Sequence, residues 1–206
     1  ASAKFSSTGG QLFLRWDAGT DRAGYGGTSF PCEELLDFPV ASAATCVWTS
    51  DAELTVSLDY RARCVPGDRI TALKDKLTPF CEHNDCSCWL PVNSSATTLL
   101  VPDEPLVPST VFLGATKSGS CSDIALDITS STGSGGRGWV QVGWTVNGTL
   151  PPRNLTLLRE YVADLQALDP TEPRLDVPNT FLQAGETYTF AATLENFLGF
   201  SSTSAP

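Results

Sequence analysis

The sequence contains no methionine and one histidine, and it carries few charged side chains for its length. Of 206 residues, 17% are Asp, Glu, Lys or Arg; 13 side chains are basic and 23 are acidic, giving a net charge of −10. Nucleic-acid binding needs clustered lysine and arginine to neutralise phosphates, and this acidic chain has no such cluster. An anionic membrane surface would repel it for the same reason.

Long apolar runs are also missing. No run of roughly 18 apolar residues occurs, so we expect no transmembrane helix and no membrane insertion by this segment. The first residues, Ala1 to Lys4, lack the apolar core of a signal peptide. We therefore expect a mature or excised part of a longer polypeptide, with any signal or membrane anchor outside it.

The shortage of histidine argues against catalysis. His83 is the only candidate base for a serine or cysteine nucleophile, and no Gly-x-Ser-x-Gly motif is present. The glycine-rich stretch 133–138 (GSGGRG) lacks the Lys-Ser/Thr of a phosphate-binding loop, so we interpret it as a flexible inter-strand loop. No carboxylate pair stands out as that of a glycosidase. We predict a non-enzymatic protein that uses no cofactor.

The chain is rich in cysteines and in glycosylation sequons. Three Asn-x-Ser/Thr sequons begin at Asn93, Asn147 and Asn154. Sequons and frequent cysteines together favour an oxidising, secretory compartment, so we predict an extracellular or cell-surface protein with N-linked glycans at these asparagines. The seven cysteines are Cys32, Cys46, Cys64, Cys81, Cys86, Cys88 and Cys121.

In this compartment the cysteines are predicted to form disulfides. We expect Cys32 to pair with Cys46, Cys64 to pair with one of the cysteines in the cluster 81–88, and Cys121 to take another of that cluster. Because seven is odd, one cysteine is expected to pair outside this segment. Zinc is the alternative for residues 81–88, but the cluster contains no Cys-x2-Cys pair and no second half-site, so no metal is predicted there.

Calcium is a second metal alternative, in the loop after the first predicted strand. Asp17, Thr20 and Asp21, with Asp59, offer the oxygen ligands that calcium prefers. Loops rich in Asp and Gly are more often simple turns, so calcium is not our prediction.

Carbohydrate binding is a further alternative, carried by the tryptophans. Trp16 and Trp144 alternate with apolar residues and are expected in the core. Trp89 and Trp139 lie in loop sequence and are expected at the surface, where their rings could stack on sugars.

The apolar pattern predicts an all-β fold. Apolar side chains alternate with polar ones at 12–16, 54–58, 124–128, 140–146 and 188–194, which is typical of half-buried strands. Apolar residues spaced by three and four predict one amphipathic helix at 154–168, lying on the flank of a sheet.

Three prolines between 101 and 108 indicate a linker or edge strand. We predict two immunoglobulin-like β-sandwich modules in tandem, 1–100 and 101–206, with the helix inserted in the second.

The second half resembles a known extracellular module. Residues 121–131 (CSDIALDITSS), the Gly-Gly-Arg at 135–137 and the Trp-Thr-Val at 144–146 are similar to the start of a module of receptor-for-egg-jelly and polycystin proteins. Residues 182–190 and 195–202 are similar to its closing strands. The segment 154–168 is similar to its helical insertion. The resemblance covers residues 105–206.

The first half resembles the partner module of giant algal cell-surface and flagellar-hair (mastigoneme) proteins, through residues 3–6, 14–21 and 46–48. Both resemblances imply architecture or adhesion rather than turnover, with other protein chains or neighbouring modules of the same polypeptide as partners. The expected function is a structural segment of a large extracellular glycoprotein, such as a ciliary appendage. A polycystin-like receptor ectodomain and a carbohydrate-binding module are the alternatives.

Overall fold

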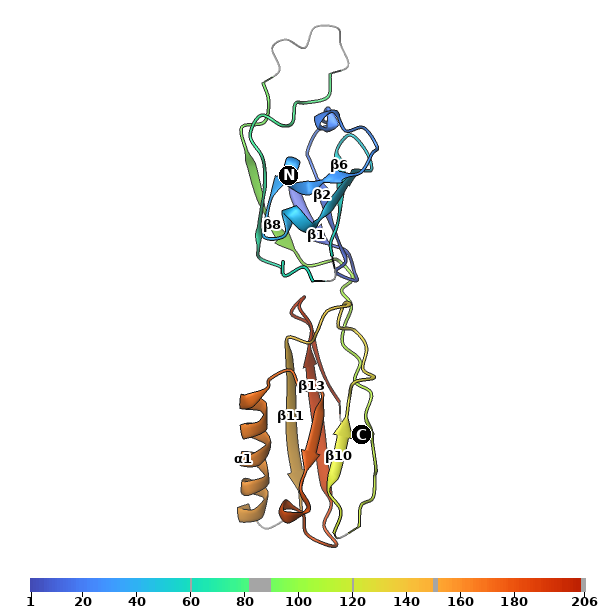
Figure 1. Cartoon of the computed structure of the whole chain (residues 1–206), viewed down its shortest axis with the longest axis vertical. Helices are drawn as coiled ribbons and strands as arrows, with labels where there is room; N and C mark the ends of the chain where they lie inside the picture. The colour runs from blue at the N-terminus through green and yellow to red at the C-terminus, as the bar shows by residue number, and fades with distance from the viewer. Residues whose placement is uncertain (60, 82–89, 120, 150–151, 205–206) are drawn as a thin grey trace. The chain divides into compact units, whose positions relative to one another are not determined.

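The computed structural model describes residues 1–59, 61–81, 90–119, 121–149 and 152–204, apart from the side chains at 152 and 153. It divides the chain into two compact units, Ala1–Pro105 and Leu106–Pro206 (Figure 1). Both units are built mainly from β-strands, and the described residues contain a single α-helix. The all-β expectation is therefore confirmed at the level of sheets.

The first unit contains one eight-stranded sheet with the order β3-β5-β6-β2-β1-β8-β7-β4. All neighbours are antiparallel except β1 and β8, which run parallel. The strands are β1 (Ser2–Phe5), β2 (Gln11–Arg15), β3 (Phe30–Pro31), β4 (Leu36–Asp37), β5 (Thr45–Trp48), β6 (Glu53–Ser57), β7 (Arg69–Ala72) and β8 (Ser95–Leu100). Short 3-10 turns η1 (Arg22–Gly24), η2 (Cys32–Glu34) and η3 (Ala41–Ala43) connect some of them.

The two ends of this sheet are joined by the chain itself. β3 and β4 stand at opposite ends of the strand order, yet only η2 and Leu35 separate them in sequence. The sheet must therefore fold back on itself, and this encloses one apolar core. Alternation in the sequence supplies that core, because Leu12, Leu54 and Val56 are at most 1% exposed while their sequence neighbours point outward.

The second unit contains two three-stranded sheets that share a core. One sheet has the order β12-β10-β9, with β9 (Leu113–Gly114), β10 (Ile124–Asp127) and β12 (Arg174–Val177). The other has the order β11-β13-β14, with β11 (Gln141–Gly148), β13 (Tyr188–Glu195) and β14 (Ser201–Ser204). A 3-10 turn, η4 (Asn179–Phe181), follows β12. Side chains from β10, β11, β12 and β13 pack into one buried cluster, so the sheets face each other like the layers of a sandwich.

Helix α1 (Pro152–Leu168) lies beside β11 (Figure 1). Proline suits the first helical position because its missing N–H would have no helical partner there, and the helix stops before Asp169-Pro170. Leu158 and Val162 are buried against the core, which confirms the predicted helix and its inward apolar stripe. It begins two residues earlier than the predicted 154–168.

The helix also covers the free edge of β11. The Gln166 side chain accepts a hydrogen bond from the Trp144 backbone N–H (3.0 Å) and donates one to the Trp144 carbonyl (2.9 Å). Arg159 Nε donates to the Val146 carbonyl at 3.0 Å. These side chains replace a neighbouring strand, so the edge of β11 is closed to further pairing.

One predicted core position is wrong. Val140 extends the alternating pattern of 142, 144 and 146, but its side chain is 52% exposed. The strand begins one residue later, at Gln141, and the Val140 N–H still bonds to the Glu195 carbonyl. The residue therefore lies at the end of the ladder, where its side chain is exposed.

A buried asparagine joins three parts of the second unit. Asn196 is 1% exposed and uses its whole amide group. Its Nδ2 donates to the carbonyls of Leu106 (2.7 Å) and Gly133 (2.9 Å), and its Oδ1 accepts from the N–H groups of Leu198 and Phe200 at 3.1 Å each. The segment before β9, the loop before β11 and the β13–β14 turn are thereby fixed together.

The glycine-rich loop takes part in this arrangement, and its first glycine is tightly packed. Gly133 has a φ of +97°, and a Cβ added there would lie 2.5 Å from the Val107 carbonyl oxygen. Only glycine fits such a position. Residue 133 thus has a structural role that its interpretation as part of a flexible loop did not include.

We predict that Asn196→Ala lowers the free energy of unfolding of the second unit by about 3–4 kcal/mol. The substitution leaves two carbonyls and two N–H groups without their partner in a buried site. Urea denaturation followed by circular dichroism measures the loss. Asn179→Ala is the control, since it removes a half-buried amide whose side chain forms no hydrogen bond with the described residues, and it should change stability by less than about 0.5 kcal/mol. Equal losses in the two variants would contradict the role assigned to Asn196.

Candidate functional site

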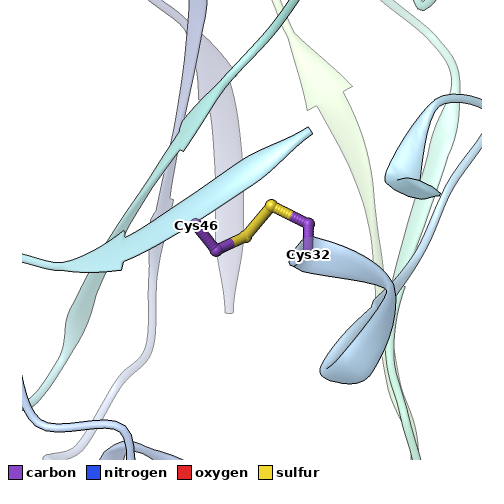
Figure 2. The surroundings of a disulfide bond; sticks show 2 residues. All are labelled: Cys32 and Cys46. Carbon is purple, nitrogen blue, oxygen red and sulfur yellow. A yellow bond between two sulfur atoms is a disulfide. The ribbon is translucent and has the colours of Figure 1, made fainter. Parts of the chain in front are cut away.

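A buried disulfide lies where the sheet of the first unit closes. Cys32 begins η2, between β3 and β4, and Cys46 lies in β5; Figure 2 shows the bond crossing from that turn to the strand. The S–S distance is 2.04 Å and the Cα–Cα distance is 5.1 Å. Both cysteines are 0% exposed. The predicted Cys32–Cys46 pair is therefore confirmed.

The other cysteines are only partly described. Cys81 also takes part in a disulfide. Cys64 is buried in the first unit, and Cys121 is exposed in the second. Cys86 and Cys88 lie outside the described residues, so the predicted pairings of Cys64 and Cys121 with the cluster stay predictions.

The zinc and calcium alternatives involve different parts of the chain, and only the calcium alternative lies mainly in described residues. His83 and most of the zinc alternative lie outside the described residues. The calcium alternative can be checked in part: Asp21 Oδ1 accepts from the N–H groups of Ala23 and Thr78 and so caps a turn. Thr20 is buried and donates its hydroxyl to the Asp51 carbonyl. Within the described ranges, no group of three or more His, Cys, Asp or Glu residues could hold a metal ion.

All three sequon asparagines have exposed side chains. Asn93 precedes β8, Asn147 lies near the end of β11, and Asn154 lies in the first turn of α1. An N-linked glycan is bulky and hydrated, so its attachment site must lie at the surface. The three positions meet that requirement.

Asn147 has the best-defined surroundings. Arg159 Nη2 donates to Asn147 Oδ1 at 2.7 Å, which fixes one side of the amide. The Nδ2 atom, to which a glycan would be joined, has no hydrogen-bond partner among the described residues. The sequon threonine, Thr149, donates its hydroxyl to Glu186. The Asn147 amide is therefore exposed, and its orientation is fixed by the hydrogen bond from Arg159.

The tryptophans do not form an exposed platform within the described residues. Trp48 and Trp144 are at most 5% exposed. Trp16 is half-buried and lies against Trp48, with 5.0 Å between ring centroids. The core position of Trp144 agrees with prediction, Trp16 is only half-buried, and Trp139, expected at the surface, is half-buried against the core of the second unit. Trp89 lies outside the described residues.

A carboxylate with a lowered pKa stabilises the second unit. Asp127 Oδ1 accepts from the hydroxyl and the N–H of Thr129 at 2.6 and 2.7 Å, and Oδ2 accepts from Arg174 Nε at 3.0 Å. These bonds favour the ionised form, and those from Thr129 contribute most to holding the pKa of Asp127 below its ordinary value of 3.8. Arg174 belongs to β12, so the ion pair joins two neighbouring strands.

The comparisons with known proteins supply no relative. No protein-family model matches this chain, and a search of curated proteins finds no similar sequence. The described helix is also not long and apolar enough to cross a membrane.

We predict that Cys32→Ala/Cys46→Ala lowers the stability of the first unit by about 3 kcal/mol. The two cysteines are 14 residues apart, and closing a loop of about 15 residues removes roughly that much unfolded-state entropy. Urea unfolding under non-reducing conditions measures the change. Each single Cys→Ala variant should lose about as much as the double variant, because either change removes the bond. Additive single losses would show that packing, not the cross-link, carries the effect.

We predict that the contribution of Asp127 depends on pH. Its pKa is lower in the folded chain than in the unfolded chain, so its stabilisation is fully present above about pH 4 and is lost as the pH falls through the folded value. The stability difference between the wild type and Asp127→Asn should be constant from about pH 7 to pH 5 and narrow below about pH 4. Thermal unfolding at a series of pH values measures it. A difference that stays constant down to about pH 2 would contradict the assignment.

Proposed function

We propose that this chain is a structural segment of a large extracellular glycoprotein, an architectural component of a cell-surface or ciliary appendage that resembles a mastigoneme. The observation that carries the proposal is the fully buried Cys32–Cys46 disulfide at the closure of the first unit. Disulfides of this kind persist in oxidising compartments and are rare in the cytosol. The exposed sequon asparagines support the same compartment.

We further propose that both units are immunoglobulin-like sandwiches. Strand pairing supports this in the first unit, where β5, β6, β2 and β1 are consecutive neighbours and β8, β7 and β4 form a second group. In the second unit, two facing three-stranded sheets contribute the core, and α1 follows β11 at the sheet edge. Rigid units of this kind can act as spacers in an extended polypeptide.

Electrostatics and surface chemistry favour a passive role. A net charge of −10 keeps such a segment soluble and repels nucleic acids. Several polar side chains of the second unit, among them Gln166 and Asn196, bind the chain's own backbone and so stabilise the fold. Solubility and a stable fold are the properties that a structural spacer requires.

We predict three N-linked glycans on the chain when it passes through a eukaryotic secretory pathway. Intact-mass measurement before and after treatment with a peptide N-glycosidase should show the loss of three glycans. Asn93→Gln, Asn147→Gln and Asn154→Gln should each remove one.

Asn179→Gln is the matched control, because Asn179 is not part of a sequon and its substitution should leave the glycan number unchanged. Thiol counting on the same material tests the disulfides. A secreted chain without sugar and with seven reactive thiols would overturn the proposed function.

A further inference from the structure

A groove of about 460 Å³ lies between strand β11 and helix α1 of the second unit, the two elements that stand side by side in Figure 1. Residues from both elements line it: Thr145, Val146 and Asn147 from β11, and Arg159, Ala163 and Gln166 from α1. Its walls are held together by the hydrogen bonds from Gln166 and Arg159 to the backbone of β11. One of the sequon asparagines therefore lies in the wall of a preformed groove.

The groove has an apolar floor and a polar rim. Val146 and Val162, which line it, are at most 3% exposed and so lie deepest. Asn147 and Ala163 are exposed and so lie at its opening, where Arg159 adds a guanidinium. A sugar ring has C–H groups on its faces and polar groups around its edge. Such a ring suits an apolar floor that is bordered by a few polar side chains.

The Asn147 amide is oriented so that an attached sugar would lie on the side of the helix. Arg159 Nη2 donates to Asn147 Oδ1 at 2.7 Å. A glycan replaces one hydrogen of Nδ2 and leaves Oδ1 able to accept this bond. The resulting secondary amide is planar and trans, which places C1 of the sugar on the same side of the C–N bond as Oδ1. Because Oδ1 faces Arg159, the sugar is directed toward α1.

We propose that the first N-acetylglucosamine of a glycan on Asn147 occupies this groove and stabilises the packing of α1 against β11. The proposal rests on the extracellular function given above, since the glycan is added in a secretory pathway. Arg159 uses two of its five N–H groups on the Val146 carbonyl and on Asn147, so others can donate to oxygens of the sugar. The covalent tether gives the sugar a high effective concentration, so contacts too weak to bind a free sugar still stabilise the folded unit.

The test compares two samples of one polypeptide that differ by a single sugar. Asn93→Gln/Asn154→Gln leaves Asn147 as the only sequon. This chain is made in a eukaryotic secretory host and also in a bacterial periplasm, where disulfides form but this glycan is not added. An endoglycosidase trims the glycan to its first N-acetylglucosamine, and intact mass counts the sugar. We expect a midpoint of thermal unfolding at least about 3 °C higher with the sugar, and slower amide exchange at 141–148.

Controls place the sugar in the groove. Ala163→Leu fills the groove and should remove most of the gain in midpoint that the sugar gives. Ala167→Leu, at an exposed position of α1 outside the groove, is the matched control and should keep the gain. A chain with its only glycan at Asn154, which does not line the groove, should gain less than about 1 °C after the same trimming.

Other outcomes overturn the proposal. A sugar on Asn147 that leaves the midpoint unchanged would reject it, and so would equal gains from sugars on Asn147 and Asn154. A gain that persists in full in Ala163→Leu would show that the sugar lies outside the groove. A secreted chain with no sugar on Asn147 would contradict both this proposal and the predicted glycosylation. The mass measurement detects that case before stability is measured, so failure of the proposed function and failure of the groove are distinguished.

Discussion

An unpaired strand edge exposes backbone N–H and C=O groups that will pair with whatever strand comes near, and both units are organised around this constraint. In the first unit the chain from β3 to β4 contacts both ends of the sheet order, so the sheet folds back on itself. The Cys32–Cys46 bond then ties that closing segment to β5. The disulfide and the strand pairing that closes the sheet therefore both constrain the segment from β3 to β4.

The second unit meets the constraint with side chains. Gln166 presents an amide with the same donor and acceptor as a peptide group, and it bonds both backbone atoms of Trp144. Arg159 satisfies the next outward carbonyl, that of Val146, and also holds the side chain of Asn147. A glycan on Asn147 would therefore lie on the strand that α1 covers.

Sequence patterns predicted several of the half-buried strands and the helix, but they did not predict β8, which has six residues. Apolar and polar side chains alternate in β2, β6, β10, β11 and β13, and apolar side chains recur at the helical period in α1. Each of these elements buries one face, so its own sequence carries the pattern. The two-residue strands β3, β4 and β9 have too few residues for a pattern. They form because distant strands offer backbone partners, which no local window contains.

The same distinction separates the site features that sequence could supply from those it could not. Sequons and the Cys32–Cys46 pair are local in sequence. The roles of Asn196, Gln166 and Gly133 depend on carbonyls and N–H groups up to 90 residues away. The alternation in Arg-Leu-Asp-Val at 174–177 is also local in sequence, and it matches β12.

The parallel pairing of β1 with β8 has a mechanical consequence. β1 is the first strand of its unit and β8 the last, and Ala3 and Lys4 pair with Leu99 and Leu100. Tension applied between the two ends of this unit would pull these strands in opposite directions along their length. Their hydrogen bonds, and the contact from Lys4 to Asp103, would bear the load together in shear instead of opening one at a time. A unit built in this way resists stretching applied at its two ends.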